Sequence, residues 1–301
     1  MPANRMPAAE VVVSADLVQR PLDRQHPDLA HLPLRFLANG WDNVMFRLGE
    51  ERVVRLPRRE MAAAIIGNEQ RWLPGLAGKL PIPIPYPERT GVPADGYPWS
   101  WSIVPYLPGS PAADGPALDP GHAATAIGGF LGALHMPAPP DAPLNPFRGV
   151  PLREREQAFA ANLRVVSGVD ADAVLDVWTS AIAAPGHAGP PAWVHGDLHP
   201  ANILVHDGRI SGVIDFGDIT AGDPAADLSV AWMLLPPRWH GVFRSAYEAA
   251  GNGLIDDAMW TRARGWAIGL GVMFLAHSAD NPQLHAVGRR AVHAALGDLS
   301  W

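Results

Sequence analysis

Short apolar runs alternate with turn-forming residues over the first hundred positions of the chain. Runs at 34–37, 44–48 and 53–56 are separated by the polar stretch 39–43 and by a Gly-Glu-Glu-Arg turn at 49–52, and another run follows at 99–104. Apolar runs of this length between turns are typical of β-strands. The pattern therefore predicts a small, mostly antiparallel sheet in the first third of the chain.

Helical spacing of apolar residues begins at 61–73, where Pro74 and Gly75 are expected to end a helix. Prolines at every second position of 79–87 exclude a helix or an interior strand, so this segment should be an extended connection. From position 119 the spacing is helical almost throughout. We expect helices at 123–135, 152–166, 171–183 and 228–235, and a mainly helical segment at 239–301 whose tryptophans belong to the core.

One stretch of the second half departs from this helical pattern. The β-branched apolar runs 203–205 and 210–214 flank an Asp-Gly pair at 207–208, which favours a hairpin turn. Antiparallel pairing of these runs brings Asn202, just before the first, close to Asp215, just after the second. An amide oxygen and a carboxylate facing one point suit Mg²⁺. Asp197, five residues before Asn202, should approach the same point and can orient an incoming hydroxyl or accept its proton.

The spacing of these polar residues is that of a phosphoryl-transfer site. His195-Gly196-Asp197, followed by Asn202 and by Asp215-Phe216-Gly217, matches the catalytic and metal loops of protein kinases, except that protein kinases have His-Arg-Asp and a later Ala-Pro-Glu. With those departures the chain resembles the aminoglycoside phosphotransferase (APH) family of small-molecule kinases. The resemblance covers most of 35–235 and is specific at these two loops.

The resemblance implies an α+β, protein-kinase-like fold of two lobes. The N-terminal nucleotide-binding lobe would span 1–104, with an antiparallel sheet and one helix. A hinge would follow at 105–109, and a mainly helical lobe at 110–301 would carry the catalytic and acceptor-binding residues. The implied reaction moves the γ-phosphoryl group of ATP or GTP to a hydroxyl of an aminoglycoside-like antibiotic or a similar metabolite, and a macrolide is the alternative acceptor.

The resemblance also assigns roles to the residues of the catalytic loops. Asp197 is expected to orient and deprotonate the acceptor hydroxyl, and Asn202 with Asp215 to hold Mg²⁺. His195 would brace the loop through hydrogen bonds. Asp227 corresponds to a structural aspartate that supports the same loop.

Nucleotide-binding residues are expected in the first lobe. The only lysine is Lys79, so a Walker A sequence is excluded, and Arg55 is the candidate for the phosphate-binding cation of the third strand. An arginine pointing to solvent is the alternative interpretation of Arg55, and Arg58 and Arg59 are expected to be solvated. The partner of Arg55 would be Glu69, with Glu60 as the rival.

Two backbone features complete the nucleotide site. The loop 39–43, including Asn43, would cover the phosphates with its N–H groups, although it lacks the Gly-x-Gly-x-x-Gly pattern and is otherwise a simple hairpin turn. The base would bind the hinge, where Pro105 has no N–H and the donor must come from Tyr106 or Leu107.

Composition narrows the class of protein further. The chain has 301 residues and no cysteine, which excludes disulfides and thiolate chemistry. Positions 1–10 lack a signal-peptide core and the apolar run 265–276 is too short to cross a bilayer, so we expect a cytoplasmic protein without a membrane partner. Residues 105–301 carry a net charge of −8 and residues 1–104 carry +1, for a total of −7. An acidic second part argues against nucleic acid and favours a cationic or neutral acceptor, and the alternative is that the acidic surface serves solubility.

Two functions from other classes remain open at this point. His195, Asp197 and His199 alternate like the ligands of a metallohydrolase, although no further His and Asp cluster lies upstream. The arginine at position 55 also leaves room for a nucleotide-binding pseudokinase without turnover. The presence of Asp197, Asn202 and Asp215 together favours the active phosphotransferase, whose product would be a modified, inactivated antibiotic in a resistance setting.

Overall fold

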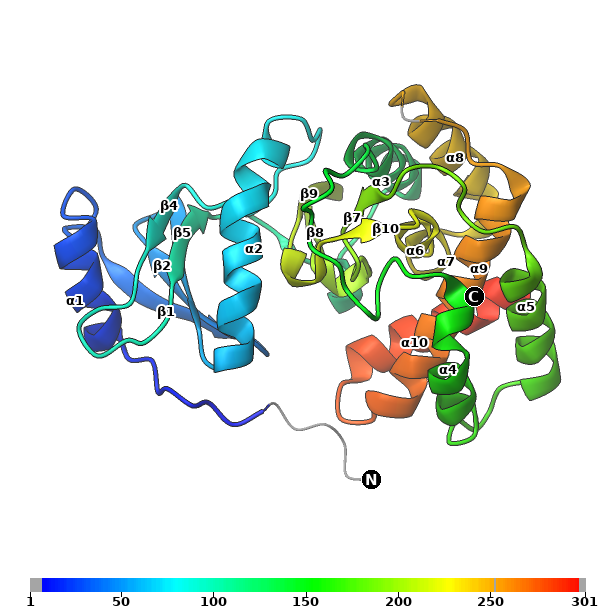
Figure 1. The fold of residues 1–301 in the computed structure, drawn as a ribbon, viewed down its shortest axis with the longest axis horizontal. Helices are drawn as coiled ribbons and strands as arrows, with labels where there is room; N and C mark the ends of the chain where they lie inside the picture. The colour runs from blue at the N-terminus through cyan, green and yellow to red at the C-terminus, as the bar shows by residue number, and fades with distance from the viewer. Residues whose placement is uncertain (1–6, 252, 298–301) are drawn as a thin grey trace. The chain divides into compact units, whose positions relative to one another are not determined.

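The computed structural model describes residues 7–251 and 253–297, so the expected core position of Trp301 lies outside the described residues (Figure 1). The described chain forms two compact units. The sheet unit comprises residues 7–78 and Pro83–Leu107, and the helical unit comprises Lys79–Ile82 and residues 108–297. The chain leaves the sheet unit after Gly78, returns to it at Pro83 and leaves it again between Leu107 and Pro108. The hinge expected at 105–109 stays a prediction.

Five antiparallel strands form the sheet of the sheet unit, in the order β1-β2-β3-β5-β4. Four of them lie where the apolar runs predict strands, and the three-residue β4 was not expected. The strands are β1 (Leu34–Asn39), β2 (Asn43–Leu48), β3 (Arg52–Pro57), β4 (Arg89–Gly91) and β5 (Trp101–Pro105).

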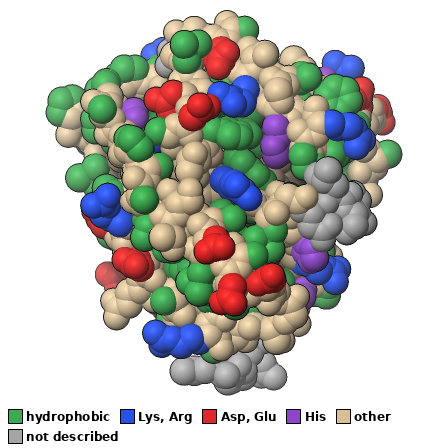
Figure 2. Space-filling model, turned by 90° about the vertical axis from the view of Figure 1, so that its right-hand side faces the viewer, with side chains coloured by type: hydrophobic (Ala, Val, Ile, Leu, Met, Phe, Trp, Pro, Cys, Tyr) green, Lys and Arg blue, Asp and Glu red, His purple; other side chains and the backbone are tan. Residues whose placement is uncertain are grey.

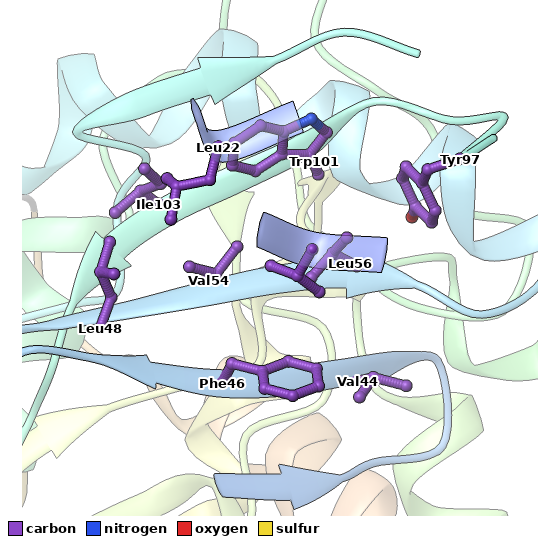
Figure 3. Packing of buried hydrophobic residues seen from close by; sticks show 10 residues of the cluster. Leu22, Val44, Phe46, Leu48, Val54, Leu56, Tyr97, Trp101 and Ile103 are labelled. Atoms are coloured by element: carbon purple, nitrogen blue, oxygen red, sulfur yellow. The ribbon is translucent and has the colours of Figure 1, made fainter. Parts of the chain in front are cut away.

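Two helices cover opposite faces of this sheet. Helix α1 (Ala15–Gln25), capped by Ser14, packs Val18 and Leu22 against side chains of β2, β3 and β5, and Figure 3 shows Leu22 above Val54 and Leu56. Since successive strand residues point to opposite faces, Arg55 points away from this cluster, to the side where α2 (Glu60–Ala77) lies. Because both faces of β3 are buried, the strand has apolar residues on both sides of Arg55 instead of alternating apolar and polar ones.

The prediction that Pro74 ends helix α2 is wrong. The helix continues through Pro74 to Ala77. A proline inside a helix removes one backbone hydrogen bond, and only three residues follow it here. Leu73 and Leu76 are buried on either side of Pro74, so packing of the last turn offsets the lost bond. The structure has neither helix nor strand at 79–87, as predicted, although Lys79 lies in a turn and 81–82 form a bend.

The helical unit is built mainly from eight α-helices in its described part, some of them shorter than predicted. The segment 152–166 forms a 3-10 turn (Leu152–Arg155) and a short helix instead of one long helix, and 228–235 lies over two short helices. The helices are α3 (Pro120–Leu134), α4 (Glu156–Leu163), α5 (Ala171–Ala183), α6 (Ala225–Leu228), α7 (Val230–Leu234), α8 (His240–Ala249), α9 (Asp257–His277) and α10 (Pro282–Leu296).

Two short sheets interrupt these helices. Strand β7 (Ala192–Val194) pairs with β10 (Thr220–Gly222), and β8 (Ile203–His206) pairs with β9 (Arg209–Val213) and with β6 (Ser110–Pro111). The predicted hairpin is confirmed: Asp207 and Gly208 both have positive φ, as a type I′ turn requires. Within the described residues no helix is long and apolar enough to cross a membrane.

Candidate active site

The His195-Gly196-Asp197 loop begins where strand β7 ends. β7 is held in register by β10, whose Thr220 pairs with Val194. Gly196 has φ +86°, and a Cβ at this position would lie 2.4 Å from the carbonyl oxygen of Asp218. The loop therefore requires glycine on two grounds, the left-handed backbone and the close approach of another chain segment.

The Asp227 carboxylate fixes the backbone of this loop. Its Oδ2 accepts the N–H of His195 at 2.7 Å and its Oδ1 accepts the N–H of Gly196 at 3.0 Å. Oδ2 also lies 3.2 Å from His135 Nε2, and His135 Nδ1 lies 3.1 Å from the hydroxyl of Tyr247. All these groups are buried, where hydrogen bonds to a charged acceptor are strong. The structure thus gives Asp227 the supporting position that the sequence predicted for it.

His195 is fully buried, and both of its ring nitrogens are hydrogen-bonded. Nδ1 accepts the backbone N–H of Asp197 at 3.2 Å, so the ring proton lies on Nε2, which donates to the carbonyl of Ile214 at 3.0 Å. The ring thus joins the loop of Asp197 to the strand that leads to Asp215, as expected for a bracing residue. Neither nitrogen is left for a metal ion, which removes the support for a metallohydrolase.

The Asp197 carboxylate is held by two cationic or polar partners. Arg148 Nη2 donates to Oδ1 at 2.7 Å, and His199 Nε2 lies 3.3 Å from Oδ2. Burial alone would raise the pKa of Asp197, but the charge of Arg148 and the contact with His199 outweigh burial and hold the pKa below its ordinary value. Asp197 is therefore ionised at neutral pH and is a weaker base than an ordinary carboxylate.

Sequence reasoning did not identify Arg148. It lies in a loop without periodic pattern, and its role depends on partners 49 and 70 positions away, Asp197 and Asp218. The loop is fastened on both sides of Arg148. Asn145 donates to Thr220 Oγ1 at 2.9 Å and to Asp218 Oδ1 at 2.8 Å, and the carbonyl of Gly149 accepts the N–H of Asp223 at 2.8 Å. These contacts fix the position of Arg148 beside Asp197.

The hairpin brings the two predicted metal ligands to one end of β8 and β9. Ile203 pairs with Val213, and the N–H of Ile214 donates to the carbonyl of Asn202 at 2.9 Å. Asp215 follows directly, with φ +65°, a left-handed conformation that is uncommon for a residue other than glycine. Asn202 Nδ2 donates to the Asp197 carbonyl at 2.8 Å, so its amide oxygen points the other way.

These donors fit a magnesium ion that also binds phosphate. Asn202 and Asp215 offer an amide oxygen and a carboxylate, which are the oxygen ligands that Mg²⁺ prefers. Among the described residues no cluster of three or more His, Cys, Asp or Glu side chains is arranged to hold a metal ion. One or two protein ligands nevertheless suffice when phosphate oxygens and water complete the shell.

Arg55 and Glu69 form a buried ion pair in the sheet unit. Arg55 Nη1 donates to Glu69 Oε2 at 2.9 Å and Nη2 donates to Oε1 at 3.2 Å, a two-pronged pairing. Their side chains are 8% and 1% exposed, so a solvent-facing arginine is excluded. Glu60, the rival partner, instead begins α2, and its N–H donates to Glu10 Oε2 at 3.0 Å.

The loop between β1 and β2 is tied down by arginines that the sequence placed in solvent. Arg58 is buried and its Nη1 donates to the carbonyl of Gly40 at 3.3 Å, and Arg59 forms an ion pair with Asp42. The expectation of solvated arginines was wrong, because this loop supplies acceptors for both. The N–H of Gly40 donates to the carbonyl of Asn43 at 2.8 Å and closes the turn.

The backbone after β5 offers only one of the two expected donors to a base. The N–H of Tyr106 already donates to the carbonyl of Glu51 at 2.7 Å, and its ring lies under the guanidinium of Arg47. The prediction of Tyr106 as a donor to the base is therefore withdrawn, since binding a base through its N–H would break this bond. Leu107 remains the candidate.

Comparisons with known proteins point the same way as this geometry. The model of the family described as phosphotransferase enzyme family (APH) matches residues 33–266. Among curated protein sequences, none matches the chain.

Solved structures share the fold at low sequence identity. The GDP and kanamycin complex of APH(2″)-IIIa is 19% identical with a TM-score of 0.65, covering 93% of this chain and 98% of that one. The macrolide 2′-phosphotransferase MphH from Brachybacterium faecium, as apoenzyme, is 24% identical with a TM-score of 0.61, covering 94% and 98%. The predicted α+β, protein-kinase-like fold with a small antiparallel sheet and a helical C-terminal region is confirmed.

Proposed function

Because the chain belongs to the phosphotransferase enzyme family and is a phosphotransferase with an alcohol group as acceptor, we propose that it transfers the γ-phosphoryl group of ATP or GTP to a small-molecule hydroxyl. Aminoglycoside-like antibiotics and macrolides are the acceptors that neighbouring structures name, and they are the first two classes to test on this chain. Inactivation of such an antibiotic would be the biological outcome.

The placement of Asp197 is the observation that carries this proposal. Its ionised carboxylate lies at the end of a loop whose backbone Asp227 and His195 hold rigidly, beside the hairpin that ends in Asp215. Phosphoryl transfer has a loose transition state, so orientation of the attacking hydroxyl contributes more than full removal of its proton. A carboxylate with a lowered pKa suits that task.

Asn202 and Asp215 would hold Mg²⁺, which when bound neutralises charge on the transferring phosphate groups. In the sheet unit, the Arg55–Glu69 pair would direct one guanidinium face to the phosphates, and the N–H of Leu107 would bind the base. The loop 39–43 around Asn43 would cover the phosphates. These assignments draw on the family pattern and on the contacts described above.

Two variants test the mechanism together. Asp197→Asn keeps the shape of the side chain but removes its charge, and we expect kcat to fall by about 10²-fold or more with nucleotide affinity unchanged. Asp215→Asn should instead weaken Mg²⁺-dependent nucleotide binding, measured by titration calorimetry with ATP and with GTP. Transfer at the wild-type rate in both variants would show that these residues are not the catalytic machinery.

A pseudokinase predicts a different pattern. The protein would then bind nucleotide with Mg²⁺, but no acceptor would stimulate nucleotide consumption and Asp197→Asn would change no rate. Measuring nucleoside diphosphate release with and without each acceptor, and the mass of the acceptor afterwards, distinguishes the two.

A further inference from the structure

A small cavity lies next to Arg148 within the helical unit. It has a volume of about 40 Å³ and is lined by residues of the 3-10 turn Leu152–Arg155 and of helices α4, α5 and α9, together with Arg148 itself. Arg148 also donates to Asp197, so one guanidinium connects the cavity with the proposed catalytic carboxylate. A space of this size holds a carboxylate-sized group rather than a whole acceptor.

Three of the residues that line the cavity, Arg155, Trp178 and Trp266, carry hydrogen-bond donors. Arg155 lines the cavity half-buried, its guanidinium lies over the ring of Phe147, and no carboxylate of the described residues pairs with it. The indole N–H groups of Trp178 and Trp266, both 3% exposed, have no acceptor among the described residues. Buried donors without acceptors are uncommon in proteins and point to a missing partner.

Acceptor groups on the lining side chains, by contrast, are absent or already hydrogen-bonded. None of the residues that line the cavity is Asp or Glu. The amide oxygen of Asn162 lies 2.8 Å from His277 Nε2 and is used there. Burial and the neighbouring charge of Arg148 lower the pKa of Arg155, which agrees with two guanidinium groups facing a common space.

The net charge of the chain does not decide the charge that an acceptor meets at this place. On the face of the molecule in Figure 2, acidic side chains are interspersed with basic and hydrophobic ones. The local wall is cationic and aromatic, with Trp178 stacked on Phe159 at 3.9 Å between ring centroids. The ammonium groups of a polycation would find no carboxylate among the lining residues.

We propose that the acceptor hydroxyl compound carries an anionic group that binds in this cavity against Arg155 and the donors of Trp178 and Trp266. This inference rests on the proposed function, since it takes Asp197 as the residue that meets the acceptor hydroxyl. The anionic group and the hydroxyl would lie on the two sides of Arg148. A polycationic aminoglycoside is then a poor acceptor.

Three probes with the same body test the charge preference. 3-Phenyllactate is anionic, 3-phenylpropane-1,2-diol is neutral and phenylalaninol is cationic, and each has a hydroxyl. Binding to the full-length protein, measured by ligand-observed NMR, should be at least about tenfold tighter for phenyllactate than for phenylalaninol, since a hydrogen-bonded ion pair contributes roughly that much. Equal affinities, or tighter binding of phenylalaninol, would overturn the inference.

Two arginines on one turn provide the matched variants. Arg155→Gln should remove most of the preference for phenyllactate. Arg153→Gln, two positions away and outside this cavity, should leave it unchanged, because Arg153 instead donates to the carbonyl of Ile182. Loss of the preference in both variants, or in neither, would contradict the assignment to Arg155.

Turnover separates this inference from the proposed function. If kanamycin is phosphorylated more efficiently than any anionic acceptor and Arg155→Gln leaves its kcat/KM unchanged, the acceptor inference fails and the phosphotransferase function stands. If phenyllactate binds through Arg155 but no acceptor of any charge is phosphorylated, the proposed function fails while the anion site stands.

Discussion

Single residues at the site combine two demands, a special backbone conformation and a fixed hydrogen-bond partner. Gly196 and Asp215 both adopt left-handed backbone conformations, at the ends of β7 and β9. Asp227 then satisfies the two N–H groups that the turn at Gly196 leaves without strand partners. Strain at functional positions persists only where the surroundings hold it in place. Here the Asp227 carboxylate provides that restraint at Gly196.

Gly196→Ala tests this restraint. The new Cβ would meet the Asp218 carbonyl at 2.4 Å in addition to the cost of a positive φ, so stability should fall by roughly 2–4 kcal/mol and transfer should be lost. Gly168→Ala is the matched control, because Gly168 has φ +78° but nothing within 4 Å of a Cβ. It should cost only about 1 kcal/mol. Equal losses in urea unfolding would mean that the contact with Asp218 is soft.

Asp227→Asn tests the clamp. An amide keeps one acceptor and turns the other into a donor that faces an N–H, so one loop hydrogen bond is lost and a repulsive contact appears. We expect about 2–4 kcal/mol lower stability and at least a tenfold lower kcat, with nucleotide affinity unchanged. Steady-state kinetics and nucleotide titration measure both effects. A wild-type kcat in a stable variant would show that the loop needs no such support.

At the scale of elements, the sequence predicted those whose signals are local. The hairpin of β8 and β9 follows from two β-branched runs and an Asp-Gly turn, and with it the approach of Asn202 to Asp215. Arg148 could not be predicted, because its position depends on tertiary contacts with residues 218–223 and not on its own neighbours. Helix α2 passed Pro74 for a similar reason, since burial of Leu76 overrides the local stop signal.

Helix α2 therefore contains residues that propensity disfavours. Gly75 lies in its last turns, and a Cβ added there would have nothing within 4 Å, so Gly75→Ala should raise the stability of the sheet unit by roughly 0.5–1 kcal/mol. Urea unfolding followed by circular dichroism measures the change. A destabilised Gly75→Ala variant would indicate that this end of α2 needs a flexible backbone.

Tyr97, in the core between α1 and the sheet, makes the stability of the protein depend on pH. Burial raises the pKa of Tyr97 above its ordinary value, and its hydroxyl donates to the carbonyl of Pro57 at 2.8 Å. Below about pH 10 both folded and unfolded forms keep the proton, and above it the unfolded chain ionises first, so stability falls as pH rises. Tyr97→Phe should flatten this fall between pH 9 and pH 11, values set by the ordinary tyrosine pKa of about 10.

The neutral-pH behaviour of Tyr97→Phe provides the control. Loss of the bond to Pro57 should cost about 1 kcal/mol at pH 7. A variant that loses stability at pH 7 yet keeps the full alkaline slope would place the titrating group elsewhere.

At the scale of the whole molecule, the proposed tasks are divided between two compact units. Arg55 and Glu69 belong to the sheet unit, and the residues around Asp197 belong to the helical unit. Each unit has its own buried core, so damage to one should unfold it without the same effect on the other. A variant of the sheet unit can therefore be tested for its stability and, separately, for its effect on nucleotide binding by the whole protein.

The Arg55–Glu69 pair allows an effect on stability to be distinguished from an effect on nucleotide binding. Arg55→Ala removes the guanidinium partner of a carboxylate that is 1% exposed, and should lower the stability of the sheet unit by about 3–5 kcal/mol. Arg55→Met combined with Glu69→Leu replaces both charges with apolar groups of similar volume and should recover most of that loss. If the pair positions phosphates, the double variant will be well folded in calorimetry yet bind Mg²⁺-ATP at least about tenfold more weakly, since a charge-assisted contact contributes that much.

Wild-type nucleotide affinity in the stable double variant would show that the pair has a structural role alone. The phosphate-binding cation would then have to be one of the arginines that tie down the 39–43 loop.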